Sequence, residues 1–144
     1  MPHRIVSSII ENQKTTTCTA QATVSKAAQL MQQSDVGAIM VTEQGRLVGI
    51  FTERDAMFRV IAQGRDAKST RLSEVMTRNP ESIESNKRFG HALHMMYEGG
   101  FRHVPVVKYG RPIGMISTRD LLGPELEEFV EEVRQREHIL EILG

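Results

Sequence analysis

Apolar residues along the chain follow two different spacings in turn. In some segments they recur three and four positions apart, which predicts one buried face of a helix. In others they form short runs bounded by polar, glycine-containing turns, which is typical of strands. The pattern predicts the element order β-α-β-β-α, written twice, with the last helix of each copy beginning near Thr52 or Ser117. The other predicted elements lie at 15–19, 24–31, 36–41 and 47–51 in the first copy, and at 81–85, 89–96, 103–107 and 112–117 in the second.

One ten-residue segment occurs twice in closely similar form. Residues 46–55 are RLVGIFTERD, and residues 111–120 are RPIGMISTRD. The offset of 65 positions holds without a gap from residues 17–55 to residues 82–120, where eight of 39 positions are identical. The apolar pattern is matched more closely than the identities. A repeat of this length indicates two copies of one supersecondary unit.

The end of the repeated segment carries the candidate chemistry. Thr52 and Ser117 each end a predicted strand and begin a helix, where a hydroxyl and free backbone N–H groups can meet a phosphate. Asp55 and Asp120 follow one turn later on the same side of the helix. A carboxylate there can accept hydrogen bonds from both hydroxyls of a ribose. The alternative is that the hydroxyl residues are plain N-caps and that the acids only favour the helix N-terminus.

The segments outside the duplicated units complete the predicted organisation. We predict a first repeat with an N-terminal helix at 1–64, a polar connector at 65–71, a second repeat at 72–122 and an amphipathic helix at 123–144. Apolar residues recur at helical spacing in the last segment, and its acids precede its basic residues, which suits the helix dipole. This helix either caps its own domain or packs against a second copy, and we predict the second arrangement.

Composition narrows the class of protein. The 144 residues are 40% hydrophobic and 25% charged, which is typical of a globular protein, and 18 basic residues balance 18 acidic ones. Zero net charge disfavours a nucleic-acid or membrane partner held by bulk charge. The single cysteine, Cys18, permits no intramolecular disulfide. No apolar stretch is long enough for a membrane span or a signal peptide, so a cytoplasmic protein is expected.

The two copies together resemble a tandem pair of CBS domains, the cystathionine-β-synthase repeat, over residues 5–122. The resemblance is carried by the apolar strand, the glycine turn and the ending that is GIFTERD in one copy and GMISTRD in the other. It implies an α/β fold in which two repeats pack sheet to sheet about a pseudo-two-fold axis, with clefts between them. It also implies a non-catalytic regulatory module of the stand-alone bacterial type, often a homodimer. The implied ligands are adenosyl compounds: AMP first, then ADP, ATP, S-adenosylmethionine or NAD.

The resemblance also implies roles for the stretch before each central strand. There Gly37 and Ala38 stand in the first copy, and Arg102 and His103 in the second. In the family this stretch offers backbone groups to the adenine edge, and a basic residue can reach phosphate. Arg102 is the best phosphate candidate, because guanidinium matches phosphate geometry; the alternative is a solvent-facing arginine. The difference between the copies predicts two sites of unequal affinity.

The resemblance also implies roles for the residues at the end of each motif. In the family the matching aspartates hold ribose and the matching hydroxyl residues lie near the phosphate, which implies these roles for Asp55, Asp120, Thr52 and Ser117. Arg54 and Arg119 beside them either neutralise phosphate, bridge to a partner subunit, or simply lie exposed on the helix.

Other constellations do not support a different chemistry. His91 and His94 are three apart on a predicted helix, but no cysteine or second cluster joins them, so no metal site is expected. No phosphate-binding loop or nucleophile motif occurs, and an enzyme is not expected. Two alternatives to a nucleotide sensor stay open: an NAD(H)-binding redox sensor of the same fold, and a structural dimerisation module without ligand. Any output would pass to a separate, unknown downstream protein.

Overall fold

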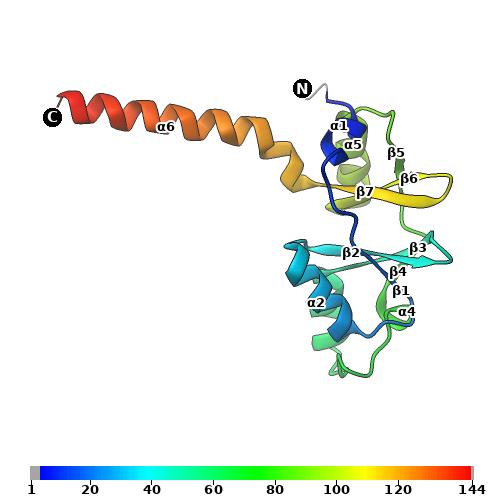
Figure 1. Ribbon diagram of the computed structural model, residues 1–144. Coiled ribbons are helices and arrows are strands. Elements are labelled where there is room, and N and C mark those ends of the chain that lie inside the picture. Colours follow the sequence, from blue (N-terminus) through cyan, green and yellow to red (C-terminus); the bar gives the residue numbers. More distant parts are fainter. Residues whose placement is uncertain (1–3, 144) are drawn as a thin grey trace.

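The computed structural model describes residues 4–143, and it is a mixed α/β structure with two sheets and a long C-terminal helix (Figure 1). This is the fold class predicted from the sequence. The first half contains α1 (Val6–Ile10), β1 (Thr17–Thr19), α2 (Val24–Ser34), β2 (Ala38–Glu43), β3 (Arg46–Thr52), α3 (Glu53–Asp55) and the π-helical segment η1 (Ala56–Ile61). The second half contains α4 (Leu72–Val75), β4 (Thr77–Arg78), β5 (Ile83–Glu84), α5 (Phe89–Gly99), β6 (His103–Lys108), β7 (Arg111–Ser117), the 3-10 segment η2 (Thr118–Leu122) and α6 (Gly123–Leu143).

The two sheets repeat the same pairing. In the first, β1 runs parallel to β2, β3 is antiparallel to β2, and β4 adds an edge. In the second, β5, β6 and β7 pair in the same senses. Each central hairpin has a bulge at the corresponding place, between Val41 and Thr42 and between Val106 and Val107. The 65-residue offset of the sequence is therefore also an offset of strand register.

The structure differs from the prediction after each motif. The first motif begins a short α-helix that widens into the π-helical turn of η1, rather than a regular helix. The second begins a 3-10 turn that runs directly into α6, so the helix predicted at Ser117 and the C-terminal helix are one continuous feature. The edge strand β4 was not predicted, because two residues without apolar alternation leave no readable pattern.

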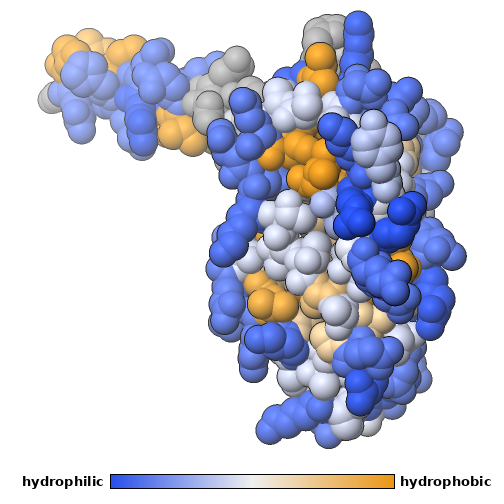
Figure 2. All heavy atoms as spheres, turned by 45° about the vertical axis from the view of Figure 1, so that its right-hand side comes forward, coloured by the Kyte–Doolittle hydropathy of each residue, from blue (hydrophilic) through white to orange (hydrophobic). Residues whose placement is uncertain are grey.

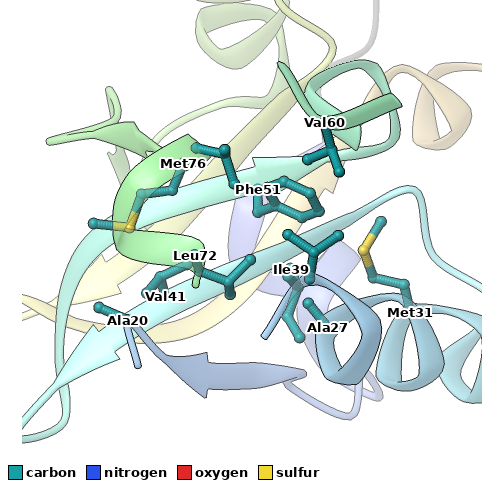
Figure 3. Close-up of a cluster of buried hydrophobic side chains, with 11 residues drawn as sticks. Ala20, Ala27, Met31, Ile39, Val41, Phe51, Val60, Leu72 and Met76 are labelled. Atoms are coloured by element: carbon teal, nitrogen blue, oxygen red, sulfur yellow. The ribbon is translucent and has the colours of Figure 1, made fainter. Parts of the chain in front are cut away.

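Each sheet covers its own hydrophobic core. The first core gathers side chains from α2, β2, β3 and α4, among them Ile39, Phe51 and Leu72, which are fully buried (Figure 3). The second gathers equivalent side chains around Phe89 from α5, β6, β7 and α1. Burial of this apolar surface is the main contribution to the stability of each half.

Each of the two short helices, α1 and α4, packs into the hydrophobic core of the other half. Helix α1 precedes the first repeat, and the sequence grouped it there, yet its buried Val6 and Ile10 lie in the second core. Helix α4 precedes the second repeat, yet Leu72 and Val75 lie in the first core. The motif glycines make this packing possible, because they leave room for side chains from the exchanged segments. A Cβ on Gly114 would lie 2.7 Å from Cβ of Ile10, and a Cβ on Gly49 would lie 2.6 Å from Sδ of Met76, just after α4.

The exchanged segments and the hairpin turns join the two sheets. Gln13 follows α1 and pairs with the edge of β7, since its side chain donates to the Met115 carbonyl at 2.8 Å and accepts from the Met115 N–H at 3.0 Å. At the turns, the Leu47 N–H donates to the Gly110 carbonyl at 2.9 Å. These contacts bring β3 and β7 together, and they place the ends of both strands beside the opposite repeat.

Helix α6 leaves the body of the molecule and projects away from it (Figure 1). Its apolar side chains at Phe129, Leu140 and Leu143 are 61%, 68% and 78% exposed. Hydrophobic surface is visible at the far end of the projecting helix (Figure 2). Along residues 129–143 the helix therefore does not cap its own domain.

Candidate functional site

Two clefts lie between the repeats, one beside each hydroxyl–aspartate motif. The Asp120 cleft has a volume of about 880 Å³ and contains Ser117 and Asp120. The Asp55 cleft has a volume of about 960 Å³ and contains Thr52 and Asp55. Both volumes fall within the range of small-molecule sites in proteins.

Each cleft takes its walls from both repeats. Opposite Ser117 and Asp120 lie the segments 14–17 and 35–37 of the first repeat. Opposite Thr52 and Asp55 lie the segments 79–81 and 100–103 of the second. These wall segments are themselves related by the offset of 65, so the clefts are equivalent by the pseudo-symmetry of the fold. The sequence alone could not say which repeat supplies which wall.

The motif residues are held by local hydrogen bonds that fix the carboxylates. In the Asp55 cleft, Oδ2 of Asp55 accepts from the N–H of Thr52 at 3.0 Å and from its hydroxyl at 3.1 Å. The Thr52 hydroxyl in turn accepts from the Asp55 N–H at 3.2 Å. In the Asp120 cleft, Oδ2 of Asp120 accepts from the Ser117 N–H at 2.8 Å. The Thr52 side chain is thus an N-cap, whereas in the second copy only the bond from the Ser117 N–H to the carboxylate is present. These local bonds are compatible with binding, because both aspartates also line a cleft.

The remaining carboxylate oxygens differ between the clefts. Oδ1 of Asp55 lies 3.5 Å from Nε of Arg59, one turn further along, and the aspartate is 9% exposed. Asp120 is less buried, and Arg4 donates to its backbone carbonyl at 2.7 Å while stacking on the ring of Phe89. The N-terminal segment thereby contacts the second motif, although the first motif is nearer to it in sequence.

Arg102 and His103 lie where the two clefts meet, and both residues line both clefts. The carbonyl of Arg102 accepts from the Thr118 N–H at 3.1 Å, which ties this stretch to the start of η2. Burial lowers the pKa of His103, and the nearby carboxylate of Glu53 opposes that shift. His103 is therefore a neutral hydrogen-bonding group at pH 7.

The other predicted residues divide between the clefts. Arg54 lines the Asp55 cleft and stacks over Phe58, with its guanidinium carbon 5.3 Å from the ring centre. Arg119 lines the Asp120 cleft and donates to the Asp35 carbonyl at 3.1 Å. Gly37 also lines the Asp120 cleft, whereas the side chain of Ala38 is fully buried behind its wall.

Glu53 borders both clefts and is not among the site residues predicted from the sequence. Its carboxylate lies against Gly37, since a Cβ on that glycine would be 3.0 Å from Oε1. The position was visible in the sequence as the one charged difference inside the repeated motif, where the second copy has Thr118. The wall residues Lys14 and Glu81 were also missed, because nothing in the local pattern places them beside the motif of the other repeat. Phe58, which follows the first motif in η1, was missed as well.

Two further observations concern residues 4–143. No three His, Cys, Asp or Glu side chains are arranged to hold a metal ion among those that the structure describes, which leaves out the side chains of 122 and 124–128. Across the same range, each helix is too short or too polar to cross a bilayer.

The chain belongs to the CBS family, since the CBS domain model matches it twice, at residues 6–62 and 72–124. It is 39% identical to the CBS domain-containing protein YhcV of Bacillus subtilis over 105 residues, covering 73% of this chain and 74% of that protein. It is 36% identical to the mitochondrial CBS domain-containing protein CBSX3 of Arabidopsis thaliana over 123 residues, covering 82% of this chain and 60% of that protein. The chain therefore spans less than two thirds of CBSX3.

Solved structures agree with this assignment. A putative signal-transduction protein with CBS domains from Burkholderia ambifaria superimposes with a TM-score of 0.77 at 31% identity, covering 86% of this chain and 95% of that one. A CBS domain protein from Pyrobaculum aerophilum complexed with AMP superimposes with a TM-score of 0.76 at 24% identity, covering 83% and 92%. The CBS domain pair of protein MJ0100, in complex with 5′-methylthioadenosine and S-adenosylmethionine, gives 0.75 at 24%, covering 83% and 94%. At 24% identity these last two likenesses show the fold alone. The predicted fold and family are confirmed.

Proposed function

We propose that this protein is a regulatory module that binds an adenine nucleotide, AMP foremost, in the clefts between its repeats. The observation that carries the proposal is the duplicated hydroxyl–aspartate motif, which lines a cleft of suitable size in both copies. One carboxylate oxygen is fixed by the cap, so the group is already oriented for the two hydroxyls of a ribose.

The adenosyl ligands of two structural neighbours support this chemistry. The Pyrobaculum protein was solved with AMP and the MJ0100 pair with S-adenosylmethionine and 5′-methylthioadenosine. All three molecules share an adenosine, so the shared ligand class is defined by adenine and ribose rather than by phosphate. The described side chains that line the two clefts include no recognisable catalytic set, and the proposed role is regulation rather than catalysis.

The deciding experiment is calorimetric titration of the purified protein with AMP, ATP, NAD and NADH. Asp55→Ala and Asp120→Ala remove the ribose acceptors, and Asp66→Ala is the matched control, because Asp66 lies in the connector outside both clefts. Because both motif aspartates also cap helices, Asp55→Asn and Asp120→Asn accompany them, and circular dichroism verifies folding. AMP binding that is lost in one or both motif variants and kept in the control supports the proposal. Binding of NADH alone favours the redox sensor, and no binding by the folded protein favours the structural module.

The protein also forms a homodimer through α6 in this proposal. The helix projects from the body with apolar side chains exposed, and Phe129, Val133, Leu140 and Leu143 recur at coiled-coil spacing on one face. Light scattering of the protein should give twice the mass of the 16.2 kDa chain. Leu140→Ser should shift the protein toward monomer, whereas Gln135→Ser, on the same helix, should not. A monomeric wild-type protein would exclude this arrangement.

A further inference from the structure

The two clefts are equivalent by the pseudo-symmetry of the fold but not by charge. Lys14 and Thr16 line the Asp120 cleft, and the residues at the equivalent positions of the Asp55 cleft are Asn79 and Glu81. One wall thus has a lysine where the other has a neutral amide. The same wall has a neutral hydroxyl where the other has a carboxylate. These two exchanges make the Asp55 wall more negative by two charges.

The rest of each lining does not cancel this difference. Arg102 and Glu53 border both clefts and contribute equally to the comparison. Each motif adds one arginine and one aspartate to its own cleft. Asp35 adds a negative charge to the Asp120 cleft, where the other cleft has Gly100. The net charge of the lining side chains is therefore zero in the Asp120 cleft and minus one in the Asp55 cleft.

The two clefts also differ in the apolar side chains that line them. The Asp55 cleft contains two aromatic rings, Phe58 and Phe101, and the position equivalent to Phe101 in the Asp120 cleft is Val36. Arg54, the arginine of this motif, stacks over Phe58. An aromatic wall with an excess of carboxylates suits adenine and ribose, and it disfavours a phosphate dianion.

From this contrast we infer that the two clefts select different adenosyl ligands. The Asp120 cleft takes the ligand that bears a phosphate, which Lys14, Arg102 and Arg119 face. The Asp55 cleft takes an adenosyl ligand without a phosphate. The inference rests on the proposed function and adds to it a division of ligands between the sites.

The test is titration with AMP and, separately, with adenosine, each against the wild type and the single-cleft variants Asp55→Asn and Asp120→Asn. We expect AMP binding to survive Asp55→Asn and to be lost in Asp120→Asn, and adenosine binding to show the opposite dependence. Lys14→Asn copies the other wall and should weaken AMP binding about tenfold with little change for adenosine, because a facing cation is lost. Glu81→Thr, in the Asp120→Asn background, should restore measurable AMP binding in the remaining cleft, because a facing carboxylate is removed.

Two charge controls separate the clefts from the general field of the protein. Lys26→Asn and Glu84→Thr make the same exchanges outside both linings, and they should leave both ligands unaffected. AMP binding that depends on Asp55 rather than Asp120 overturns the inference while leaving the proposed function in place. The inference is likewise overturned if Lys14→Asn weakens AMP binding no more than Lys26→Asn does. Failure of the wild type to bind either ligand overturns the proposed function together with the inference.

Discussion

Replacing Gly114 by alanine is expected to separate helix α1 from the sheet that it covers. Gly114 is buried in β7, and a Cβ there would lie 2.7 Å from Cβ and 2.8 Å from Cγ2 of Ile10, which real Cβ atoms essentially never approach. Ile10 cannot move aside alone, because its branched side chain is stiff and lies in the second core. The methyl group therefore has to displace α1.

Overpacking of this kind costs about 1–3 kcal/mol. For a chain of this size that corresponds to a fall in Tm of roughly 3–10 °C. Differential scanning calorimetry measures the fall, and urea unfolding measures the free energy independently. Because Gln13 follows α1 and pairs with Met115, and both residues line the Asp120 cleft, AMP binding in that cleft should weaken as well.

Gly123→Ala is the matched control. Its added methyl group would meet nothing nearer than 3.9 Å, and its φ of −52° suits alanine, so Tm should stay constant or rise slightly. An unchanged Tm in Gly114→Ala would refute the reasoning, because it would mean that α1 does not rest on the glycine. A fall of the same size in both variants would also refute it.

Three further predictions concern other parts of the molecule. Leu72→Ala should lower the free energy of unfolding by about 2–5 kcal/mol in urea titrations, because the fully buried side chain lies in the first core; a loss below about 1 kcal/mol would argue against that placement. Burial lowers the pKa of His103 below its ordinary value of 6.5, so the unfolded chain takes up the proton first and stability should fall as the pH drops below about 6.5. His103→Gln should flatten that slope between pH 7.5 and 5.5, and an identical slope would assign it to other groups. Burial raises the pKa of the Cys18 thiol to about 11, so its reaction with a thiol reagent at pH 7.5 should be far slower than in the urea-unfolded chain; equal rates would show the thiol to be accessible.

The duplicated motif explains how much of the fold the sequence could predict. The strands on either side of Gly45 and Gly110 carry long apolar runs, and both hairpins were predicted within two residues of their bounds at every end. The exchange of α1 and α4 could not be predicted, because an apolar turn of helix shows that it is buried but not against which sheet. The two-residue strands β4 and β5 depend on the neighbouring strand rather than on their own residues.

The residues of the candidate site that belong to the repeated motif could be predicted from the sequence, and most of the others could not. The motif residues Thr52, Asp55, Ser117 and Asp120 could be found because the chain repeats them, and the structure brings each pair into a cleft. Glu53 was missed although it lies within the motif, since its side chain matters only after the fold places it against Gly37. The opposite walls come from residues far away in sequence, and only the packing of the repeats determines them.

The exchanged helices also bear on the order in which the chain can acquire its structure during synthesis. Helix α1 leaves the ribosome before either sheet, yet the strand β7 on which it packs is made more than 100 residues later. The first sheet can close on α4 as soon as residues 72–76 emerge, while Val6 and Ile10 stay exposed to solvent. An isolated second repeat that starts at residue 72 would lack these two side chains and expose its core. The residues of the first core are thus contiguous in sequence, whereas the second core needs α1 from the other side of the first repeat. A chain broken at the connector separates both short helices from their cores, so it should recover its structure only when both fragments are present together.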